Sequence, residues 1–251
     1  MLTRRVRALS LKKTKLGESD LIVTLLAEDG CQIRAVAKGS RKPGSRFGAR
    51  VEPFSVVDLL LHGGRTLDII TDAETAVSHA PLRADYDRSQ AGSVVVDFLD
   101  KVSVECQAED RLFGLACATL DAMEAAGTGE LLCLVDAFLL KGMAMHGYRP
   151  QFDACVGCGA PASGSERFAL ESGGPVCDGC DCGEVTHLAA PVRAALVAMM
   201  RARMADVADL GIPGAVAADT LAFLRAYVVY HVPARLKALA LYEAEARRDA
   251  R

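Results

Sequence analysis

The sequence lacks the features of membrane proteins and of secreted disulfide-bonded proteins. No stretch approaches the roughly 18 uninterrupted apolar residues that a membrane-spanning helix needs. The first fifteen residues are basic, but no apolar block or small-residue cleavage site follows them, so we expect no signal peptide. Nine cysteines is an odd number, and we expect reduced thiols or metal ligands rather than a disulfide framework. These features favour a cytoplasmic protein.

Catalytic motifs are missing as well. None of the five histidines stands in an H-E-x-x-H, H-x-E or kinase-type arrangement, and the sequence holds no G-x-S-x-G motif and no Walker loop. We interpret each histidine as a helix-end or surface residue rather than a catalytic base. The expectation is a protein without enzymatic activity.

What is present is a large apolar fraction and an uneven charge distribution. The chain has 251 residues, of which 51% are hydrophobic, enough for a proper core in one large or two smaller domains. The net charge of −3 conceals that residues 1–50 carry twelve Lys and Arg against four acidic residues. A local basic face, not the total charge, decides attraction to a polyanion. The alternative is that these cations only solvate a small β domain.

The first 80 residues have the pattern of β-structure. Asp20 to Glu28 is a short apolar run, Asp29-Gly30 supplies a two-residue hairpin signal, and the following segment alternates apolar and polar residues. Short strands joined by polar turns suit a small closed barrel, of the OB type or, nearly as well, of the SH3-like type. The five strands are expected at residues 6–15, 20–28, 31–37, 54–61 and 67–71.

A basic loop, residues 38–50, interrupts these strands. It contains three glycines, one proline, five basic residues and no acidic residue, so it cannot pack as a helix or a central strand. We expect a long exposed loop, because loops of this length in a compact domain are usually functional and because flexible cations and backbone N–H groups suit phosphates. Three further arginines lie before or at the start of the first expected strand. The candidate nucleic-acid-binding residues are therefore Arg4, Arg5, Arg7, Lys38, Arg41, Lys42, Arg46 and Arg50.

From Pro81 onward the pattern is helical. The composition changes near residue 80, which predicts a β domain at residues 1–80 and a helical domain at residues 81–251. Together they indicate an α+β multidomain protein. The amphipathic segments predict helices at residues 88–104, 110–126, 130–146, 191–204, 215–231 and 234–247.

Two C-x₂-C pairs lie in an insert at about residues 153–184. Cys155 with Cys158 and Cys177 with Cys180 leave 18 residues between the inner cysteines, the spacing of a structural tetrahedral zinc site. Four thiolates leave no open position for water, so the zinc is expected to hold the fold rather than to catalyse. Cys182 could replace Cys180, although the symmetry of the pairs favours Cys180. We expect small core residues at Cys31, Cys106, Cys117 and Cys133.

The order of these parts resembles the RecO family of bacterial DNA-repair proteins over nearly the full length of the chain. The family usually has Leu-Lys-Ser near its C-terminal end, where this chain has Leu-Lys-Ala. The resemblance rests on Gly17-Glu18-Ser19-Asp20, Asp29-Gly30, Lys38-Gly39-Ser40-Arg41, the paired-cysteine insert and residues 234–239.

The resemblance implies an OB-fold domain, a helical domain with a zinc insert and a non-enzymatic role. It implies binding of single- and double-stranded DNA, annealing of complementary strands, and action with RecR to help RecA replace single-strand-binding protein. Phe47 and Phe54 are the barrel's few aromatic residues, so we expect phosphate contact to dominate over base stacking. The family's helical domain contacts the acidic, apolar tail of single-strand-binding protein, and candidate residues here are Arg193, Arg201, Arg203 and Arg225.

Two other functions stay open on the sequence alone. The first is a zinc-containing adaptor that binds proteins and not DNA, in which the basic loop only solvates. The second is a zinc-dependent hydrolase acting on nucleic acid, which needs an open metal position that a four-thiolate site lacks. Salt-dependent binding to single strands distinguishes the DNA-binding protein from the adaptor.

Overall fold

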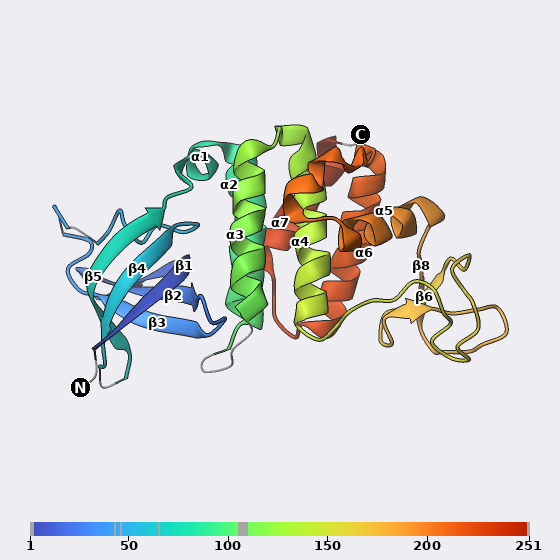
Figure 1. Cartoon of the computed structure of the whole chain (residues 1–251), viewed down its shortest axis with the longest axis horizontal. Coiled ribbons are helices and arrows are strands. Elements are labelled where there is room, and N and C mark those ends of the chain that lie inside the picture. Colours follow the sequence, from blue (N-terminus) through green and yellow to red (C-terminus); the bar gives the residue numbers. More distant parts are fainter. Residues whose placement is uncertain (1–2, 43, 46, 65, 105–109, 250–251) are drawn as a thin grey trace. The chain divides into compact units, whose positions relative to one another are not determined.

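The computed structural model describes residues 3–42, 44–45, 47–64, 66–104 and 110–249, and these residues form two compact units, Met1–Ala125 and Ala126–Arg251. The first unit holds a β-barrel followed by helices (Figure 1). The second holds four longer helices and a small three-stranded sheet. The barrel strands are β1 (Thr3–Leu16), β2 (Asp20–Ala27), β3 (Gln32–Ala37), β4 (Val56–His62) and β5 (Asp68–Val77).

The barrel closes in the order β1-β2-β3-β5-β4, with β3 and β5 parallel and the other pairs antiparallel. This is the order of an OB-type barrel, which decides against the SH3-like alternative. The long β1 pairs with β4 through its first half and with β2 through its second half. A bulge between Ser10 and Lys12 bends the strand where it passes from one partner to the other. The three arginines expected before or at the start of the first strand all lie within β1.

The barrel interior follows the alternation of the sequence. Every second residue of β2, β3 and β4 is apolar and points inward, because successive side chains of a strand lie on opposite faces. Several alanines among them match the narrow interior of a five-stranded barrel. The buried cluster consists of Ala8, Leu21, Val23, Leu25, Ala27, Ile33, Ala35, Ala37, Val51, Val57, Leu59, Leu61, Ile70 and Ala73.

Three helices complete the first unit: α1 (Ala80–Ala84), α2 (Tyr86–Val102) and α3 (Asp110–Ala125). The Asp85 carboxylate caps α2 by accepting a hydrogen bond from the backbone N–H of Arg88 at 2.9 Å. Helix α2 packs on β1 and β2, where the Phe54 ring lies so close to Gly92 that an added Cβ would be 3.2 Å from the ring. A glycine at this position therefore lets the helix approach the barrel.

His79 is one of the five histidines, which we interpret from the sequence as helix-end or surface residues. It is at a helix end, directly before α1, but it is 2% exposed. Its Nδ1 lies 2.9 Å from the Phe54 carbonyl oxygen and its Nε2 lies 2.9 Å from an Asp121 carboxylate oxygen. The ring therefore ties α3 to the segment before β4.

The second unit is built around α4 (Leu131–Met145), which is buried on almost every side. Helix α4 packs against α5 (Ala190–Arg201) and α6 (Gly214–His231), and α6 also packs against α7 (Lys237–Asp249). Three short 3₁₀ turns, at Thr128–Glu130, Met204–Asp206 and Ala208–Leu210, connect these helices. The predicted helices correspond to α2 through α7, whereas the short α1 was not predicted.

The cysteine-rich insert contains β6 (Arg167–Ala169), β7 (Gly174–Pro175) and β8 (Val185–His187), in the order β7-β6-β8. The insert is attached to the helices by an aromatic contact. Phe168 of β6 is fully buried, and its ring packs edge-on against Phe223 of α6 at a centroid distance of 5.1 Å. The third strand, β8, begins directly after the predicted end of the insert at about residue 184.

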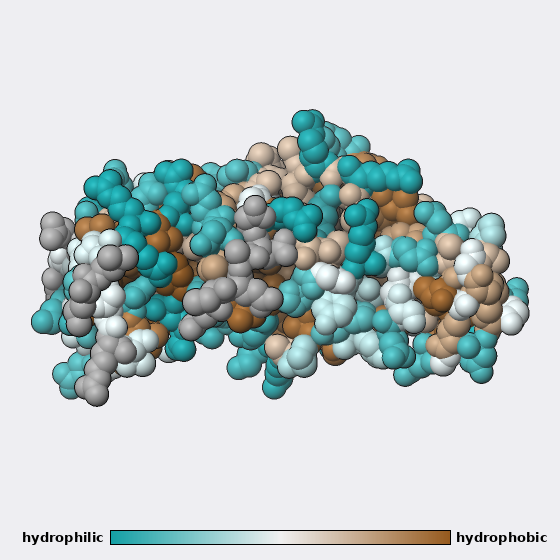
Figure 2. Space-filling model, turned by 60° about the horizontal axis from the view of Figure 1, so that its bottom comes forward, coloured by the Kyte–Doolittle hydropathy of each residue, from teal (hydrophilic) through white to brown (hydrophobic). Residues whose placement is uncertain are grey.

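The surface in view is mainly hydrophilic, with apolar residues in small separate patches (Figure 2). Among the described residues, no helix has the length and the apolar character needed to cross a membrane.

Candidate nucleic-acid interface and metal centre

The basic loop is tied to the turn between β1 and β2. The Asp20 carboxylate accepts a hydrogen bond from the backbone N–H of Gly39 at 2.8 Å. The backbone N–H of Arg41 donates to the Ser19 carbonyl at 2.9 Å, and the Arg41 side chain donates to the Gly17 carbonyl at 3.2 Å. Two sequence segments that carried the family resemblance are thus in direct contact.

With the loop attached in this way, the cations of its first half face solvent. Lys38, Arg41 and Lys42 are exposed, whereas Ser40 between them is buried, so the loop is anchored rather than exposed along its whole length. The hydrogen bond from the Gly39 N–H is the largest cause that lowers the pKa of Asp20, and the nearby lysines lower it further. Asp20 is therefore an ionised anchor, while the three cations remain accessible to phosphate groups.

The end of the loop is arranged differently. The Arg50 side chain is half-buried, donates to the Ala73 carbonyl at 2.6 Å and lies 3.9 Å from an Asp72 carboxylate oxygen. Arg50 thus points at β5 and not outward with the other loop cations. Arg46 lies outside the described residues.

The arginines of β1 are largely engaged by carboxylates. Arg4 pairs with Asp68 at 2.9 Å, and Arg7 makes a two-pronged contact with Asp58 at 2.8 and 2.9 Å. The hydrogen bonds from Arg7 lower the pKa of Asp58. Within the described residues, no ion pair joins Arg5 to a carboxylate. Of these three arginines, Arg5 is therefore the most available for contact with a phosphate.

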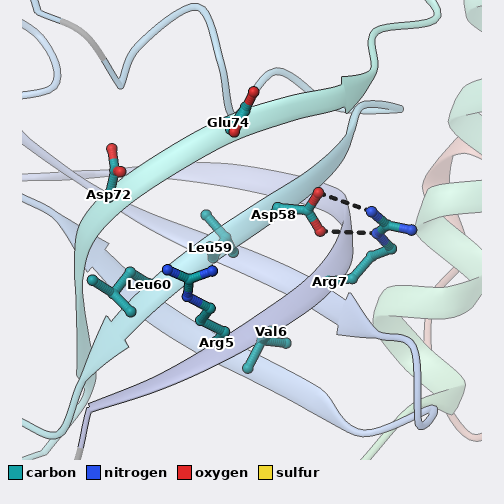
Figure 3. A pocket seen from close by; sticks show the side chains of 8 residues that line it. All are labelled: Arg5, Val6, Arg7, Asp58, Leu59, Leu60, Asp72 and Glu74. Atoms are coloured by element: carbon teal, nitrogen blue, oxygen red, sulfur yellow. Dashed lines mark hydrogen bonds and ion pairs between the residues drawn. The ribbon is translucent and has the colours of Figure 1, made fainter.

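The surface around Arg5 and Arg7 has mixed charge. Figure 3 shows Arg7 bonded to Asp58 on β4 and Arg5 beside Leu60 of the same strand, with Asp72 and Glu74 on the neighbouring β5. The residues line a hollow of about 380 Å³. Three carboxylates lie among the arginines here, so this part of the barrel surface is not uniformly positive.

The aromatic residues of the barrel are turned away from solvent. Phe54 is 4% exposed and has a left-handed backbone with φ +75°, and Phe47 is half-buried against the barrel interior. The Phe54 ring thus presents no free face for base stacking, and the Phe47 ring is partly covered. Among the described residues of the barrel strands and the basic loop, no aromatic side chain is fully exposed.

A second hollow, about 550 Å³, lies between β1 and α2 and was not foreseen. Lys12, Lys13 and Arg83 line it, together with the hydroxyls of Ser89 and Ser93. Lys12 and Lys13 belong to a basic run in β1 that the sequence displays, but only the fold shows that Arg83 lies opposite.

The four predicted ligands of the metal site lie together. The Sγ atoms of Cys155, Cys158, Cys177 and Cys180 are all within 4.8 Å of one another. The Cys158 and Cys177 sulfurs are 3.7 Å apart, close to the separation of about 3.8 Å that two ligands of a tetrahedral zinc with 2.3 Å bonds would have. The cluster can hold a metal ion such as zinc, and its donor set fits that ion.

Backbone N–H groups support the first cysteine pair. The N–H of Cys177 and that of Gly157 lie 3.3 and 3.4 Å from the Cys155 sulfur. Hydrogen bonds of this kind, the one from Cys177 foremost, lower the pKa of Cys155 to about 6 and favour the thiolate that a metal binds. Gly159 follows with φ +74°, a left-handed conformation that glycine adopts without strain.

The second cysteine pair is held by Arg167 of β6. Its guanidinium donates to the carbonyl of Cys177 at 2.8 Å and to that of Cys180 at 3.4 Å. Cys182 is not one of the four clustered sulfurs, although its sulfur would be 2.8 Å from a Cβ added at Gly157. Cys182 thus lies against the first pair but outside the group.

The other cysteines are divided between buried and half-buried positions. Cys133 is buried, and burial raises its pKa to about 11. Burial likewise raises the pKa of the half-buried Cys117 to about 11. Cys31 is half-buried, which is less than a full core position, and Cys106 lies outside the described residues.

The four arginines of the helical half are not gathered in one place. Arg193 and Arg201 line one groove of about 380 Å³ on α5, beside Phe152 and the alanines of that helix. Arg203 instead pairs with Asp206 at 2.8 Å, and Arg225 pairs with Glu243 of α7 at 2.9 Å. The groove therefore brings together only the first two of the four.

Comparison with known proteins assigns both halves of the chain. The family model described as "Recombination protein O N terminal" matches residues 1–79, and "Recombination protein O C terminal" matches residues 83–240. A DNA repair protein RecO from Nocardioides sp. is 39% identical over 245 residues, covering 95% of this chain and 98% of the relative. Those from Thermobifida fusca and Frankia casuarinae are 40% identical over 200 residues (78% and 81% covered) and 36% identical over 241 residues (93% and 95% covered).

Proposed function

Because the chain belongs to the RecO family, which acts in DNA repair and recombination, we propose that it is a non-enzymatic mediator of recombination in the cytoplasm. It binds single- and double-stranded DNA and anneals complementary strands. Together with RecR it helps to load RecA onto DNA that is coated by single-strand-binding protein. We assign the DNA-binding barrel to residues 1–80 and the helical domain to residues 81–251.

The observation that carries the DNA-binding part is the anchored loop with its three exposed cations. Lys38, Arg41 and Lys42 stand on a loop whose backbone is fixed to the β1–β2 turn by Asp20. A fixed backbone with exposed cationic side chains holds phosphates at a defined place without reading sequence. The closed barrel below it supplies a rigid support, and its inward-facing phenylalanines favour contact with the DNA backbone.

The test is to replace Lys38, Arg41 and Lys42 with alanine and to measure DNA binding across a range of salt concentrations. Affinity should fall for all sequences alike, and the log–log salt slope on single strands should flatten by about two units, since each lost phosphate contact contributes about 0.7. Adding Arg46→Ala should flatten it further. Annealing should decrease in parallel, because holding two strands together requires screening of their repulsion. A wild-type slope in the variant would place the DNA surface elsewhere.

A matched control removes cations from another surface. Arg203, Arg235 and Lys237 are exposed residues of the second unit, and their replacement with alanine changes the net charge equally. DNA affinity should change much less in this control than in the loop variant. If no salt-dependent binding is found in the unmodified protein, the protein-binding adaptor replaces the mediator as the better description.

We propose that the four-cysteine cluster holds one structural zinc ion. When bound, the zinc supplies a cross-link between the two cysteine pairs, with no ligand position left for water. Cys155 is set up for this role by two backbone N–H groups, and Arg167 holds the carbonyls of the second pair. Elemental analysis of freshly purified, reduced protein should give one zinc per chain, and a zinc-free protein of native stability would contradict the assignment.

We propose the groove on α5 as the binding site for the tail of single-strand-binding protein. An acidic, apolar peptide end requires a few fixed cations beside an apolar surface, and this groove offers Arg193 and Arg201 beside Phe152 and Val197. Arg201→Glu with Arg203→Glu should weaken binding of a tail peptide more than binding of DNA. The single variant Arg203→Glu measures the contribution of Arg203, which does not line the groove, and so isolates the contribution of Arg201. Unchanged peptide affinity in the folded double variant would reject this site.

A further inference from the structure

Three aromatic rings meet at the end of α6, in the second unit. The rings of Tyr148 and His231 are stacked with centroids 4.4 Å apart and planes inclined by 28°. The Tyr230 ring meets the same histidine edge-on at 5.1 Å. These three residues, which we call the aromatic platform, continue outward from the buried rings of Phe223 and Tyr227.

Backbone geometry fixes the platform in place. Helix α4 ends in a turn in which Gly147 has φ +95° and the N–H of Tyr148 donates to the Met143 carbonyl at 2.9 Å, the pattern of a Schellman cap. The cap therefore fixes the direction in which the backbone leaves α4 at Tyr148. His231 is held from the other side, since its Nε2 donates to the Leu170 carbonyl of the insert at 2.8 Å.

The platform combines ordered rings with solvent access. Tyr148 is 37% exposed and Tyr230 is 49% exposed, although their rings contact His231. Two phenylalanines of the barrel, in contrast, are turned inward. In a chain with only 5% aromatic residues, this exposed group of rings belongs to the second unit, whereas the basic loop belongs to the first.

We propose that the aromatic platform stacks unpaired bases of single-stranded DNA, a role that rests on the proposed DNA-binding function. Every base has a flat face, so stacking on tyrosine or histidine rings is tolerant of sequence. The edges of the platform are polar, with two tyrosine hydroxyls and an imidazole, and the exposed Arg149 follows Tyr148 directly. Such a surface fits a base with its phosphate better than it fits an apolar peptide. Duplex DNA, whose bases are already stacked, gains nothing from it.

The direct test is the double variant Tyr148→Ala with Tyr230→Ala, measured against oligo(dT) of 20 nucleotides. The loss of one stacked base should reduce affinity roughly five- to hundredfold. The salt slope should stay unchanged, because no phosphate contact is removed. An abasic oligonucleotide of the same length, and a duplex, should bind to the variant as they bind to the unmodified protein. The matched control is Tyr86→Ala, which removes a tyrosine that is 67% exposed on α2.

A second variant separates stacking from structural support. Tyr148→Phe with Tyr230→Phe keeps both rings and should retain the affinity for oligo(dT). Because the chain has five tyrosines and no tryptophan, its tyrosine emission is directly observable. Oligo(dT) should quench this emission in the unmodified protein and in Tyr86→Ala, and much of the quenching should disappear in the phenylalanine variant. Unchanged thermal unfolding would show that each variant folds.

The outcomes also distinguish this inference from the proposed function. If the alanine variant binds oligo(dT) as tightly as the unmodified protein does, the platform does not stack bases, whereas the DNA-binding function stands. If affinity for the abasic oligonucleotide falls equally, the rings act through folding and the inference is overturned. If the unmodified protein binds no single strand at all, the failure lies with the proposed function itself.

Discussion

The barrel of the first unit and the cysteine-rich insert of the second are both small β-structures, but different interactions hold them together. The barrel closes on itself and buries a continuous aliphatic cluster on every second residue of its strands. The insert has strands of two or three residues, and its largest buried side chain, Phe168, packs on a helix outside it. A structure with so little interior of its own depends on cross-links, which the four clustered sulfurs can provide.

The two units also differ in the burial and hydrogen bonding of their carboxylates. In the barrel, Asp20 and Asp58 lie at the surface, and hydrogen bonds from Gly39 and Arg7 lower their pKa values. In the second unit, Asp136 of α4 is fully buried, and neither carboxylate oxygen has a hydrogen-bond partner among the described residues. Burial raises the pKa of Asp136 well above its ordinary value. The barrel's acids favour folding when charged, and Asp136 favours it when neutral.

Loss of a metal ligand should have the largest effect and should be confined to the insert. Cys158→Ser removes one of the four sulfurs, and because metal binding and local folding are coupled, we expect lost metal and rapid proteolysis within residues 153–184. The barrel should keep its unfolding transition. Cys182→Ser is the matched control and should retain the metal. If Cys182→Ser loses the metal while Cys180→Ser retains it, the fourth ligand is wrongly assigned.

The contact between the insert and α6 should be next in size. Phe168→Ala leaves a cavity against Phe223 and should destabilise the second unit by about 3–5 kcal/mol in denaturant unfolding. Phe168→Leu keeps much of the volume and should cost less. A small loss for Phe168→Ala with metal bound would mean that the sulfur cluster alone supports the insert.

The buried carboxyl should give a gain of stability with a distinctive pH dependence. Asp136→Leu has the same branched shape without the unsatisfied polar atoms and should stabilise the second unit by about 1–3 kcal/mol at pH 7. Since the folded pKa is raised, the stability from neutral Asp136 is complete below the unfolded pKa near 4 and is lost as pH rises towards the folded value. The advantage of the variant should therefore shrink as pH falls to about 4. A pH-independent difference would contradict this account.

The smallest effects should come from the arginine pairs on the barrel surface. Arg7 is engaged by Asp58, so Arg7→Ala should weaken DNA binding less than Lys42→Ala does. Asp58→Ala should strengthen DNA binding slightly, because it releases Arg7 and removes a negative charge. Neither change should shift the melting temperature much, since solvent screens an exposed pair. Equal losses of affinity for Arg7→Ala and Lys42→Ala would show that Arg7 contacts DNA despite its partner.

Much of the fold was predictable because the signals are local. Alternation along β2 and β3 and the Asp29-Gly30 turn predict the first hairpin, and the Cys-x₂-Cys spacing predicts which four sulfurs meet. Strand ends were less certain. β5 continues to Val77, beyond its predicted end at residue 71, because pairing with β4 extends a strand whose outer residues show little apolar pattern.

The availability of charged groups was not predictable from the sequence. Arg4 and Arg7 look like Lys38 and Lys42 when they are counted as basic residues, but their carboxylate partners come from β4 and β5, more than fifty positions away. Arg225 is likewise engaged by Glu243 of α7. Such pairings depend on strand register and helix packing, which no single segment specifies.

By itself, the sequence determined the α+β division, the barrel's alternating interior and the presence of a paired-cysteine site, because each follows from periodicity or spacing within one segment. Only the tertiary structure decided the pairing partners along each barrel strand, the contact between Asp20 and the basic loop, and the aromatic platform of Tyr148, Tyr230 and His231. The physical reason is range: backbone periodicity acts over neighbouring residues, whereas hydrogen bonds, ion pairs and ring contacts join whichever groups the closed fold brings within a few ångströms.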